Sequence, residues 1–357
     1  MRVGVLTTSY PRDAGDAAGA FVAGFSRWLA ANVGDVDVVC ADAARPLFYR
    51  GGAPVALARR GRWAEAAAFS ARLLIEAKRR ARGWDAVVSH WLVPSGAIGD
   101  ACAGRRRRAA HLAIAHGSDV RLLSALPGGR ALVRRLSRRA DLVYVADALR
   151  VDGAPGRVVP MAIDVAPIGA ATTAEARRRA RARLGLDGFV VAFVGRLIHD
   201  KGADRAIDAL PEDATLLVAG DGPERASLVK RAADKRVRFV GHVSGDDKLA
   251  LFAAADAMII PSRIDGAPTV ALEALAAGLP MVATRAGGLP ELLDDSVALF
   301  GDLRAALARL RDDAELRQAM SRACRARAPR HDWSTVAPTL WNRAVSHNPG
   351  CLRTIRV

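Results

Sequence analysis

The stretch MIIPSRIDGAPTVALEALAAGLP, residues 258–280, predicts a strand, a loop and a helix in immediate succession. The short apolar run 258–260 ends at a proline, and the helix-forming run 269–277 is closed by Gly278. Proline is favoured at the first position of a helix, and glycine adopts the left-handed conformation just past the end at little cost. We therefore expect a helix that opens at Pro268 and stops before Gly278.

The loop before this helix is suited to bind an anion. Gly266 has no side chain to block a ligand, and the first-turn amides of a helix carry partial positive charge and lack intrahelical acceptors. Asp265 lies in the loop and Glu273 on the helix, so two carboxylates can face one ligand from different sides. The combination favours a site for a phosphate-containing ligand. A structural loop followed by a solvated Glu273 is the alternative.

The pattern continues beyond the helix, and its members are Asp265, Gly266, Glu273, Ala274, Gly278, Pro280, Gly287, Gly288, Pro290 and Glu291. It resembles the donor-site signature of the retaining family 4 glycosyltransferases, the glycosyl transferases group 1. The resemblance implies an α/β chain with the GT-B fold, in which two Rossmann-like doubly wound parallel-sheet domains face a central cleft. The family pattern usually begins with Glu. Here Asp265 stands in its place, with a carboxylate one methylene shorter.

The same resemblance places the donor site on the C-terminal half. Arg196 and Lys201 follow a buried strand expected at 189–194, in the family's G-R-x-x-x-x-K-G pattern. Arginine offers a planar fork and lysine a mobile point charge to a diphosphate that gains charge as it leaves. Surface charges flanking a turn are the alternative. The donor-binding candidates are Gly195, Gly220, Gly222, Gly241, Gly266, Ala267, Pro268, Thr269 and Glu273, and the catalytic candidates are His116, Asp265, Arg196 and Lys201.

The N-terminal half supplies the acceptor side. His116 opens a segment that resembles the family's H-G-x-D, in which the histidine contacts the donor sugar at the reaction centre; a structural histidine is the alternative. Gly15 and Gly19 lie in the first loop, which in the family closes over the donor phosphates and the acceptor. His90 ends another expected strand, and Asp119 closes the His116 segment. A flexible tether at the first loop and a packed core edge at His90 stay open as alternatives.

Short apolar runs alternate with helical patterns in this half. We expect strands at 2–7, 36–40, 86–89, 112–115 and 142–145, and helices at 20–31 and 64–82. Continuous rather than alternating hydrophobicity indicates strands buried on both faces, hence a parallel sheet covered by helices. In such sheets ligands bind beyond the carboxyl ends of the strands.

The 357 residues suffice for two domains of ordinary size. We expect an N-terminal acceptor-side domain at 1–165, a C-terminal nucleotide-sugar-binding domain at 166–332, and a tail at 333–357 that crosses back to the first domain, as in GT-B enzymes. Residues 165–173 are small and contain Pro and Gly, so they are interpreted as a linker. Residues 303–327 are interpreted as one amphipathic helix.

A net charge of +16 predicts an anionic partner. Arginines form a run at 105–108 and recur at helical spacing over 130–139, so both segments would present a basic face. Anionic lipid headgroups at a membrane surface would be attracted to such a face; a merely solvated face is the alternative. Nucleic acid is not expected as a partner, because the chain has no motif in which aromatic residues interleave with the basic ones.

No cofactor and no metal ion are expected. Asp35 and Asp37 mimic the D-x-D of metal-dependent transferases, but they lie at the entry of a strand and are interpreted as a strand cap. The cysteines, Cys40, Cys102, Cys324 and Cys351, are scattered and indicate neither a zinc site nor a disulfide framework. No apolar run approaches the ~20 residues that cross a bilayer. A cytoplasmic location is therefore expected, with peripheral binding to the inner face of the membrane left open.

The expected function is retaining transfer of a sugar from a UDP- or GDP-linked donor to the hydroxyl of a sugar, a lipid-linked or a small-molecule acceptor, in glycan, glycolipid or polysaccharide assembly. A nucleotide-sugar 2-epimerase shares the architecture but would need further acid and base groups around the sugar. A nucleotide-sugar-binding subunit weakened by Asp265 is the other alternative. A glycosidase is disfavoured, because it needs both carboxylates at one anomeric carbon.

Overall fold

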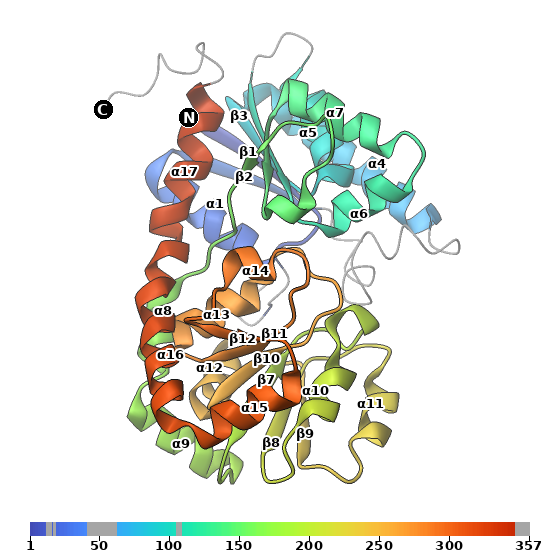
Figure 1. Cartoon of the computed structure of the whole chain (residues 1–357). Coiled ribbons are helices and arrows are strands. Elements are labelled where there is room, and N and C mark those ends of the chain that lie inside the picture. The colour runs from blue at the N-terminus through green and yellow to red at the C-terminus, as the bar shows by residue number, and fades with distance from the viewer. Residues whose placement is uncertain (12–15, 17–18, 41–62, 105–108, 347–357) are drawn as a thin grey trace. The chain divides into compact units, whose positions relative to one another are not determined.

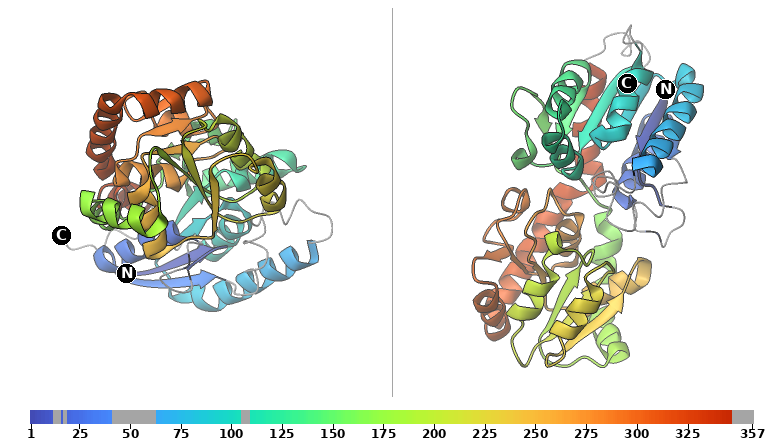
Figure 2. Two further views of the ribbon diagram at one scale, coloured as in Figure 1. Left: turned by 90° about the horizontal axis from the view of Figure 1, so that it is seen from below. Right: turned by 90° about the vertical axis from the view of Figure 1, so that its right-hand side faces the viewer.

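The computed structural model describes residues 1–11, 16, 19–40, 63–104 and 109–346. The chain forms two compact units: unit 1 comprises Met1–Ala162 and Trp333–Val357, and unit 2 comprises Ile163–Asp332. Each unit is built on its own six-stranded parallel sheet with helices on both faces (Figures 1 and 2). This confirms the predicted α/β class with two doubly wound sheets. Over the residues described, no helix combines the length and apolarity needed to cross a membrane.

The sheet of unit 1 has the strand order β2-β1-β3-β4-β5-β6. The strands are β1 Arg2–Thr7, β2 Asp35–Cys40, β3 Ala86–His90, β4 Ala110–Ala115, β5 Asp141–Tyr144 and β6 Arg157–Val158. β1 pairs in parallel with both β2 and β3, and β3 and β4 are buried along their whole length. This burial agrees with the prediction that the apolar runs form strands covered on both faces.

Helices cover both faces of this sheet. They are α1 Ala20–Asn32, α4 Trp63–Arg80, α5 Ala97–Ala103, α6 Ser118–Ala125, α7 Gly129–Arg139 and α17 Trp333–Ser346. The arginines of α7 are partly neutralised, because Arg135 and Arg139 both pair with the Asp100 carboxylate, at 3.0 and 2.5 Å. The predicted arginine run at 105–108 lies outside the described residues. Asp37 lies inside β2 and accepts hydrogen bonds from Arg80 and Trp84, each at 3.0 Å.

Helix α17 packs on α1, although more than 300 residues separate them in sequence. The Trp333 ring stacks on the Phe25 ring with centroids 5.5 Å apart. A Cβ atom at Gly24 would lie 2.1 Å from Trp333 Nε1, so only glycine admits the indole at this point. The last described helix therefore completes the first unit.

The sheet of unit 2 has the strand order β12-β11-β10-β7-β8-β9. The strands are β7 Val190–Val194, β8 Thr215–Ala219, β9 Val237–Gly241, β10 Ala257–Ile260, β11 Met281–Ala283 and β12 Ala298–Phe300. The helices are α8 Val165–Ala171, α9 Ala174–Leu184, α10 Ala203–Ala209, α11 Arg225–Arg231, α12 Gly245–Ala254, α13 Thr269–Ala277, α14 Leu289–Leu292, α15 Leu303–Asp312 and α16 Ala314–Arg327.

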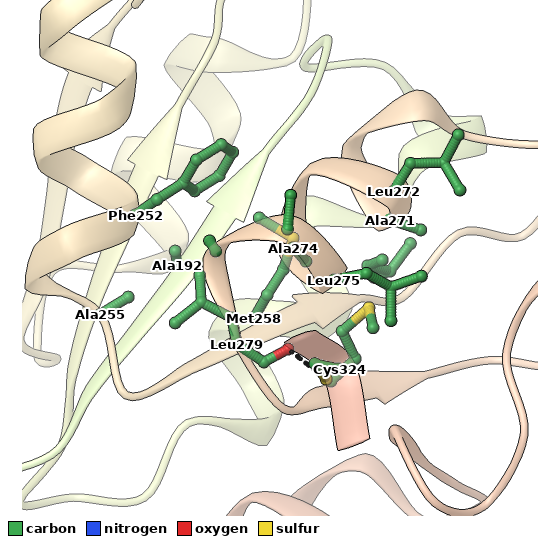
Figure 3. Close-up of a cluster of buried hydrophobic side chains, with 14 of the residues drawn as sticks. Ala192, Phe252, Ala255, Met258, Ala271, Leu272, Ala274, Leu275, Leu279 and Cys324 are labelled. Carbon is green, nitrogen blue, oxygen red and sulfur yellow. Dashed lines mark hydrogen bonds between the residues drawn. The ribbon is translucent and has the colours of Figure 1, made fainter. Parts of the chain in front are cut away.

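Two apolar clusters hold the helices of unit 2 to the sheet. On one face, side chains of α12, α13 and α16 meet those of β10, among them Phe252, Leu275, Cys324 and Met258 (Figure 3). There the Cys324 thiol is fully buried and donates to the Leu279 carbonyl at 3.4 Å. On the other face, α10 and α15 pack against alternate residues of β7 and β8. Burial on both faces fits the unbroken hydrophobicity of these strands.

Three local predictions were wrong. The supposed linker contains helix α8, because Pro167 stands in the first turn, where a missing amide costs nothing, and Val165 and Ile168 pack against the core. The helix predicted over 303–327 is two helices, since the Asp313 carboxylate caps α16 by accepting from the Leu316 amide at 2.8 Å. Pro268 has an extended backbone, with ψ of 122°, and precedes the first helical residue of α13.

Candidate functional site

The loops after β7, β8 and β9 bring three of the predicted glycines together. The Gly195 amide bonds to the Ala219 carbonyl at 3.0 Å, and the Gly220 amide bonds to the Gly241 carbonyl at 2.6 Å. A Cβ atom at Gly220 would lie 1.9 Å from the Gly195 carbonyl oxygen, at a backbone φ of +141°. Glycine is therefore required here for loop-to-loop packing, a reason distinct from ligand access. Gly222 is similarly restricted, with its Cβ position 2.4 Å from the Leu197 oxygen.

Lys201 and Asp265 form an ion pair at the carboxyl ends of the strands of unit 2. The Lys201 Nζ to Asp265 Oδ2 distance is 2.7 Å, and the exposed fractions of the two side chains are 24% and 7%. The Ser262 hydroxyl donates to the same carboxylate oxygen at 2.9 Å. Lys201 and Asp265, which were predicted from separate motifs, thus form a pair. Nothing in the sequence indicated that Ser262 would join them. Arg196 lies just past Gly195, after the end of β7, and is exposed.

A second pair ties the Asp265 loop to helix α10. Arg263 donates two hydrogen bonds to the Asp204 carboxylate, at 2.8 and 2.6 Å. These bonds lower the pKa of Asp204 to about 2, so the pair stays ionised at neutral pH. The Arg263 amide also bonds to the Asp200 carbonyl at 2.8 Å. The backbone on the amino-terminal side of Asp265 is therefore fixed before any ligand arrives.

The carboxyl-terminal side of the loop rests on a glycine pair. The Gly288 amide bonds to the Gly266 carbonyl at 2.9 Å. A Cβ atom at Gly287 would lie 1.6 Å from the Asp265 carbonyl oxygen, and its φ of +54° is left-handed. Gly266, Ala267, Pro268 and Thr269 then run into α13. Its first amides lack intrahelical acceptors, as at every helix start.

Glu273 lies on α13 and pairs with Lys248 of α12. The Lys248 Nζ to Glu273 Oε1 distance is 2.6 Å, and both side chains are about four-fifths buried. Lys248 was missed because nothing in its sequence surroundings points to a partner 25 residues away. The other carboxylate oxygen, Oε2, has no hydrogen-bond partner within the described residues, so it can still accept a bond from a ligand hydroxyl.

Two of the predicted residues of unit 1 form a histidine pair. His90, the last residue of β3, places Nδ1 3.1 Å from Nε2 of His116, which follows β4. The rings of Phe21 and Trp91 pack against His116, with centroids 4.9 and 4.8 Å away. His90 is fully buried, whereas His116 is partly exposed. His90 therefore supports His116 and does not reach the surface, in agreement with the packed-edge alternative.

Asp119 is also fully buried. Its two carboxylate oxygens accept hydrogen bonds from the Leu92 amide at 2.6 Å and the His116 amide at 3.1 Å. Burial raises the pKa of Asp119, and the backbone amides oppose that shift. In this structure Asp119 holds the loops after β3 and β4 together. On the predicted acceptor side it therefore supports other residues. Gly19 precedes α1 with φ of +73°, and Gly15 lies outside the described residues.

Burial keeps His90, His111 and His116 neutral. Desolvation lowers the pKa of His90 to about 3 and that of His111 to about 4, and it holds the pKa of His116 well below 6.5. Between the two neutral rings of His90 and His116, one nitrogen donates and the other accepts. The pair therefore supplies a fixed hydrogen-bond arrangement and no positive charge at neutral pH.

Acidification should destabilise the protein through these histidines. Unfolded histidine binds a proton near pH 6.5, whereas folded His90 and His111 do so only near pH 3 and 4, so their contribution is complete above pH 6.5 and is lost as the pH falls. At pH 5 each residue should cost ~2 kcal/mol relative to pH 7.5. Urea unfolding at both pH values measures this. His90→Asn should show a smaller loss than the wild type, and equal losses would contradict the assignment.

Among the described residues, no cluster of three or more His, Cys, Asp or Glu side chains is arranged to hold a metal ion. The chemistry available at the ends of the unit 2 strands is instead a lysine ammonium beside a carboxylate, a serine hydroxyl and glycine-rich backbone. Such groups bind phosphate and sugar hydroxyls. On unit 1, the partly exposed His116 offers a neutral imidazole.

Comparison with known proteins gives the family. Residues 188–325 match the family described as Glycosyl transferases group 1. A glycogen synthase of Mycobacterium tuberculosis is 38% identical over 163 residues, which cover 41% of this chain and 39% of that protein. A GDP-mannose-dependent monoacylated alpha-(1-6)-phosphatidylinositol monomannoside mannosyltransferase of Corynebacterium glutamicum is 32% identical over 263 residues, which cover 65% of this chain and 68% of that protein.

The fold is shared with a solved structure, HepE of Anabaena in complex with UDP. The TM-score is 0.73 at 18% identity, with 97% of this chain and 100% of that chain covered. At this identity the similarity concerns the fold alone, and the two six-stranded parallel sheets are its basis. Together, the matched region, the 32% identical relative and the shared architecture show that the chain belongs to the glycosyl transferases group 1, the family 4 glycosyltransferases with the GT-B fold.

Proposed function

We propose that the protein is a retaining glycosyltransferase that moves a hexosyl group from a UDP- or GDP-linked donor to an acceptor hydroxyl, in the assembly of a glycan or glycolipid. The observation that carries this is the Lys201–Asp265 pair at the carboxyl ends of the unit 2 strands, where α/β sheets bind their ligands. The names of the relatives support the donor class, because one uses GDP-mannose and HepE was solved with UDP.

In this proposal each group has a separate task. The Lys201 ammonium and the Arg196 guanidinium bind the diphosphate, together with the amides that follow Gly266. Asp265 accepts hydrogen bonds from sugar hydroxyls, and Oε2 of Glu273 accepts them from the ribose. His116 is assigned to the donor sugar through its neutral imidazole. A cationic and backbone-rich site of this kind stabilises a charge that grows as the reaction proceeds.

The reaction step needs no protein nucleophile. The acceptor oxygen bonds to the anomeric carbon on the face from which the diphosphate leaves, and the bond between that carbon and the phosphate oxygen breaks. The acceptor proton passes to a phosphate oxygen of the departing diphosphate, so the stereochemistry is retained and charge is balanced. The protein contributes positioning and stabilisation of the leaving charge, which are the main terms in transfers of this type.

Binding of the nucleotide should raise the melting temperature. A ligand at 100 times its Kd stabilises the folded state by ~2.7 kcal/mol. Thermal unfolding with UDP, GDP, ADP and dTDP should single out one or two bases, and Lys201→Ala should reduce the shift by about half or more. If none of the four raises the melting temperature of the wild type, the donor assignment is wrong.

A product assay then separates the alternatives. Incubation with the selected nucleotide sugar alone should leave the sugar unchanged, and transfer should begin only when an acceptor is added. An epimer formed without acceptor would instead support the 2-epimerase. Absence of transfer in the wild type, together with transfer by Asp265→Glu, would support a binding subunit weakened by the shorter carboxylate.

A further inference from the structure

Unit 2 contains a cavity of about 400 Å³ on the sheet edge opposite to the Lys201–Asp265 pair. Asp256 and Pro280 line it, and they directly precede strands β10 and β11. The Asp265 loop follows the other end of β10, a strand of four residues. At ~3.3 Å per residue the strand alone places ~13 Å between the two regions. The cavity is therefore separate from the proposed donor site.

The lining of the cavity combines buried apolar residues with arginines. Phe252, Ala255 and Leu279 are the buried apolar part of the lining, and Figure 3 shows them in the core of unit 2. For brevity we call them the apolar floor. Arg317 and Arg325, both on α16, also line it and are partly or fully exposed, and we call this side of the lining the rim. A site with an apolar surface and a few convergent polar groups is typical of small-molecule binding, and its volume lies in the usual range of ~300–1,000 Å³.

The acid that lines this cavity is already neutralised. Asp256 pairs with Arg177, at 2.5 Å, and with Arg181, and it also accepts a hydrogen bond from the Val190 amide at 2.8 Å. Asp256 is the one carboxylate in the described lining, so it leaves no negative charge to balance the two arginines of α16.

Arg317 and Arg325 each keep donors available. Arg317 uses Nη1 to bond the carbonyls of Leu310 and Arg311, and Arg325 uses Nη2 to bond the Thr172 carbonyl at 3.1 Å. Within the described structure neither forms an ion pair with a carboxylate. These bonds use one nitrogen of each guanidinium, and the Arg317 guanidinium also lies over the Phe189 ring, 5.7 Å from its centroid. The other nitrogens keep N–H groups that can bind a ligand.

Two further groups at the cavity can donate hydrogen bonds to an anion. The Gln318 side chain lines the cavity and has no hydrogen-bond partner in the described part of the chain. The first residue of α9, Ala174, also lines it, and the amino end of an eleven-residue helix carries partial positive charge. Arg317 and Arg325 are eight residues apart on one helix, so their Cα atoms are separated by ~12 Å along its axis. A compact anion fits one arginine, and an elongated ligand with two anionic groups fits both.

We propose that this cavity binds a small sugar bisphosphate, with one phosphate at Arg317, the other at Arg325, and the sugar over the apolar floor. Hydrogen bonds to charged groups contribute ~1.5–3 kcal/mol each, which corresponds to roughly tenfold or more in affinity per arginine. The inference concerns a second ligand site and does not depend on which donor or acceptor the protein uses.

Isothermal titration with fructose 1,6-bisphosphate, glucose 6-phosphate and inorganic phosphate tests the proposal. The bisphosphate should bind at least about tenfold more tightly than the monophosphate, and Arg317→Gln and Arg325→Gln should each weaken it about tenfold or more. Arg322→Gln is the matched control, because Arg322 is exposed on the same helix and does not line the cavity. Its affinity should stay within a factor of about two.

Two further variants keep the result interpretable. Gln318→Glu places a negative charge at the rim without removing any hydrogen bond of the described structure, so it should weaken the bisphosphate even if Arg325→Gln unfolds. Lys201→Ala should leave the affinity unchanged. Loss of binding in Lys201→Ala would place the bisphosphate at the donor loops and overturn the proposal, as would equal effects of Arg322→Gln and the cavity variants.

Discussion

Replacing Lys201 with alanine should lower kcat/KM for sugar transfer by about 100-fold or more. Its ammonium lies 2.7 Å from Asp265, where the proposed diphosphate departs, and no other lysine is seen to contact that carboxylate in the described structure. Loss of one donor at a site of developing negative charge costs ~2.7–4 kcal/mol. Because the interaction strengthens as the diphosphate leaves, kcat should fall together with kcat/KM. Steady-state kinetics with the selected nucleotide sugar measures both.

Lys230→Ala is the control for this experiment. Lys230 is exposed on α11 and forms no ion pair in the described structure, so its loss should change kcat/KM by less than about twofold. The Lys201 variant removes the partner of a nearly buried carboxylate, and its melting temperature must therefore be compared with that of the wild type. A folded Lys201→Ala enzyme with near-native turnover would refute the role given to this residue.

Gly287→Ala should abolish most activity although residue 287 carries no functional group. Its Cβ atom would lie 1.6 Å from the Asp265 carbonyl oxygen, and no side-chain rotation relieves such a clash because Cβ is fixed to the backbone. The Asp265 loop must then move. Displacement of reacting groups by about 1 Å costs roughly 100-fold in rate. We therefore expect a loss in kcat/KM of about 100-fold or more, measured in the same transfer assay.

The variant Gly301→Ala distinguishes the effect of the steric clash at residue 287 from the effect of a strained backbone. Gly301 also has a positive φ, +113°, but its Cβ position has no neighbour within 4 Å. Both variants should lose stability of the order of 1–2 kcal/mol from the left-handed backbone, and Gly287→Ala should lose more. Only Gly287→Ala should lose activity. Equal activities in the two variants would show that the Asp265 loop tolerates the displacement.

The sequence predicts most of the sheets and less of the helices around them. β1 was predicted residue for residue, because its apolar run is continuous and bounded by polar loop residues. Helix α8 was missed, since the Pro and Gly that suggested a linker stand where a short helix accepts them, and its stability comes from packing on α13. Tertiary contacts decide whether such a short segment is helical, and the amino-acid composition does not reveal those contacts.

At the site, the sequence predicts which residue types gather but not how they pair. Lys201 and Asp265 belong to separate motifs 64 residues apart, and their ion pair follows from the parallel order of the strands that carry them. Lys248 escaped notice because a lysine on a polar helix start is ordinary in sequence. His90 and Asp119 were predicted near the acceptor, whereas burial makes them supports for His116. Burial depends on neighbours from distant segments, which no local pattern records.

The docking of Trp333 against Gly24 and Phe25 determines the order in which the protein can finish folding during translation. Domains generally fold as units as they leave the ribosome. Unit 2 is continuous in sequence and ends at Asp332, so all of it is synthesised before α17. The first unit to emerge is therefore the last to be completed, because α1 can be covered only after α17 has been synthesised.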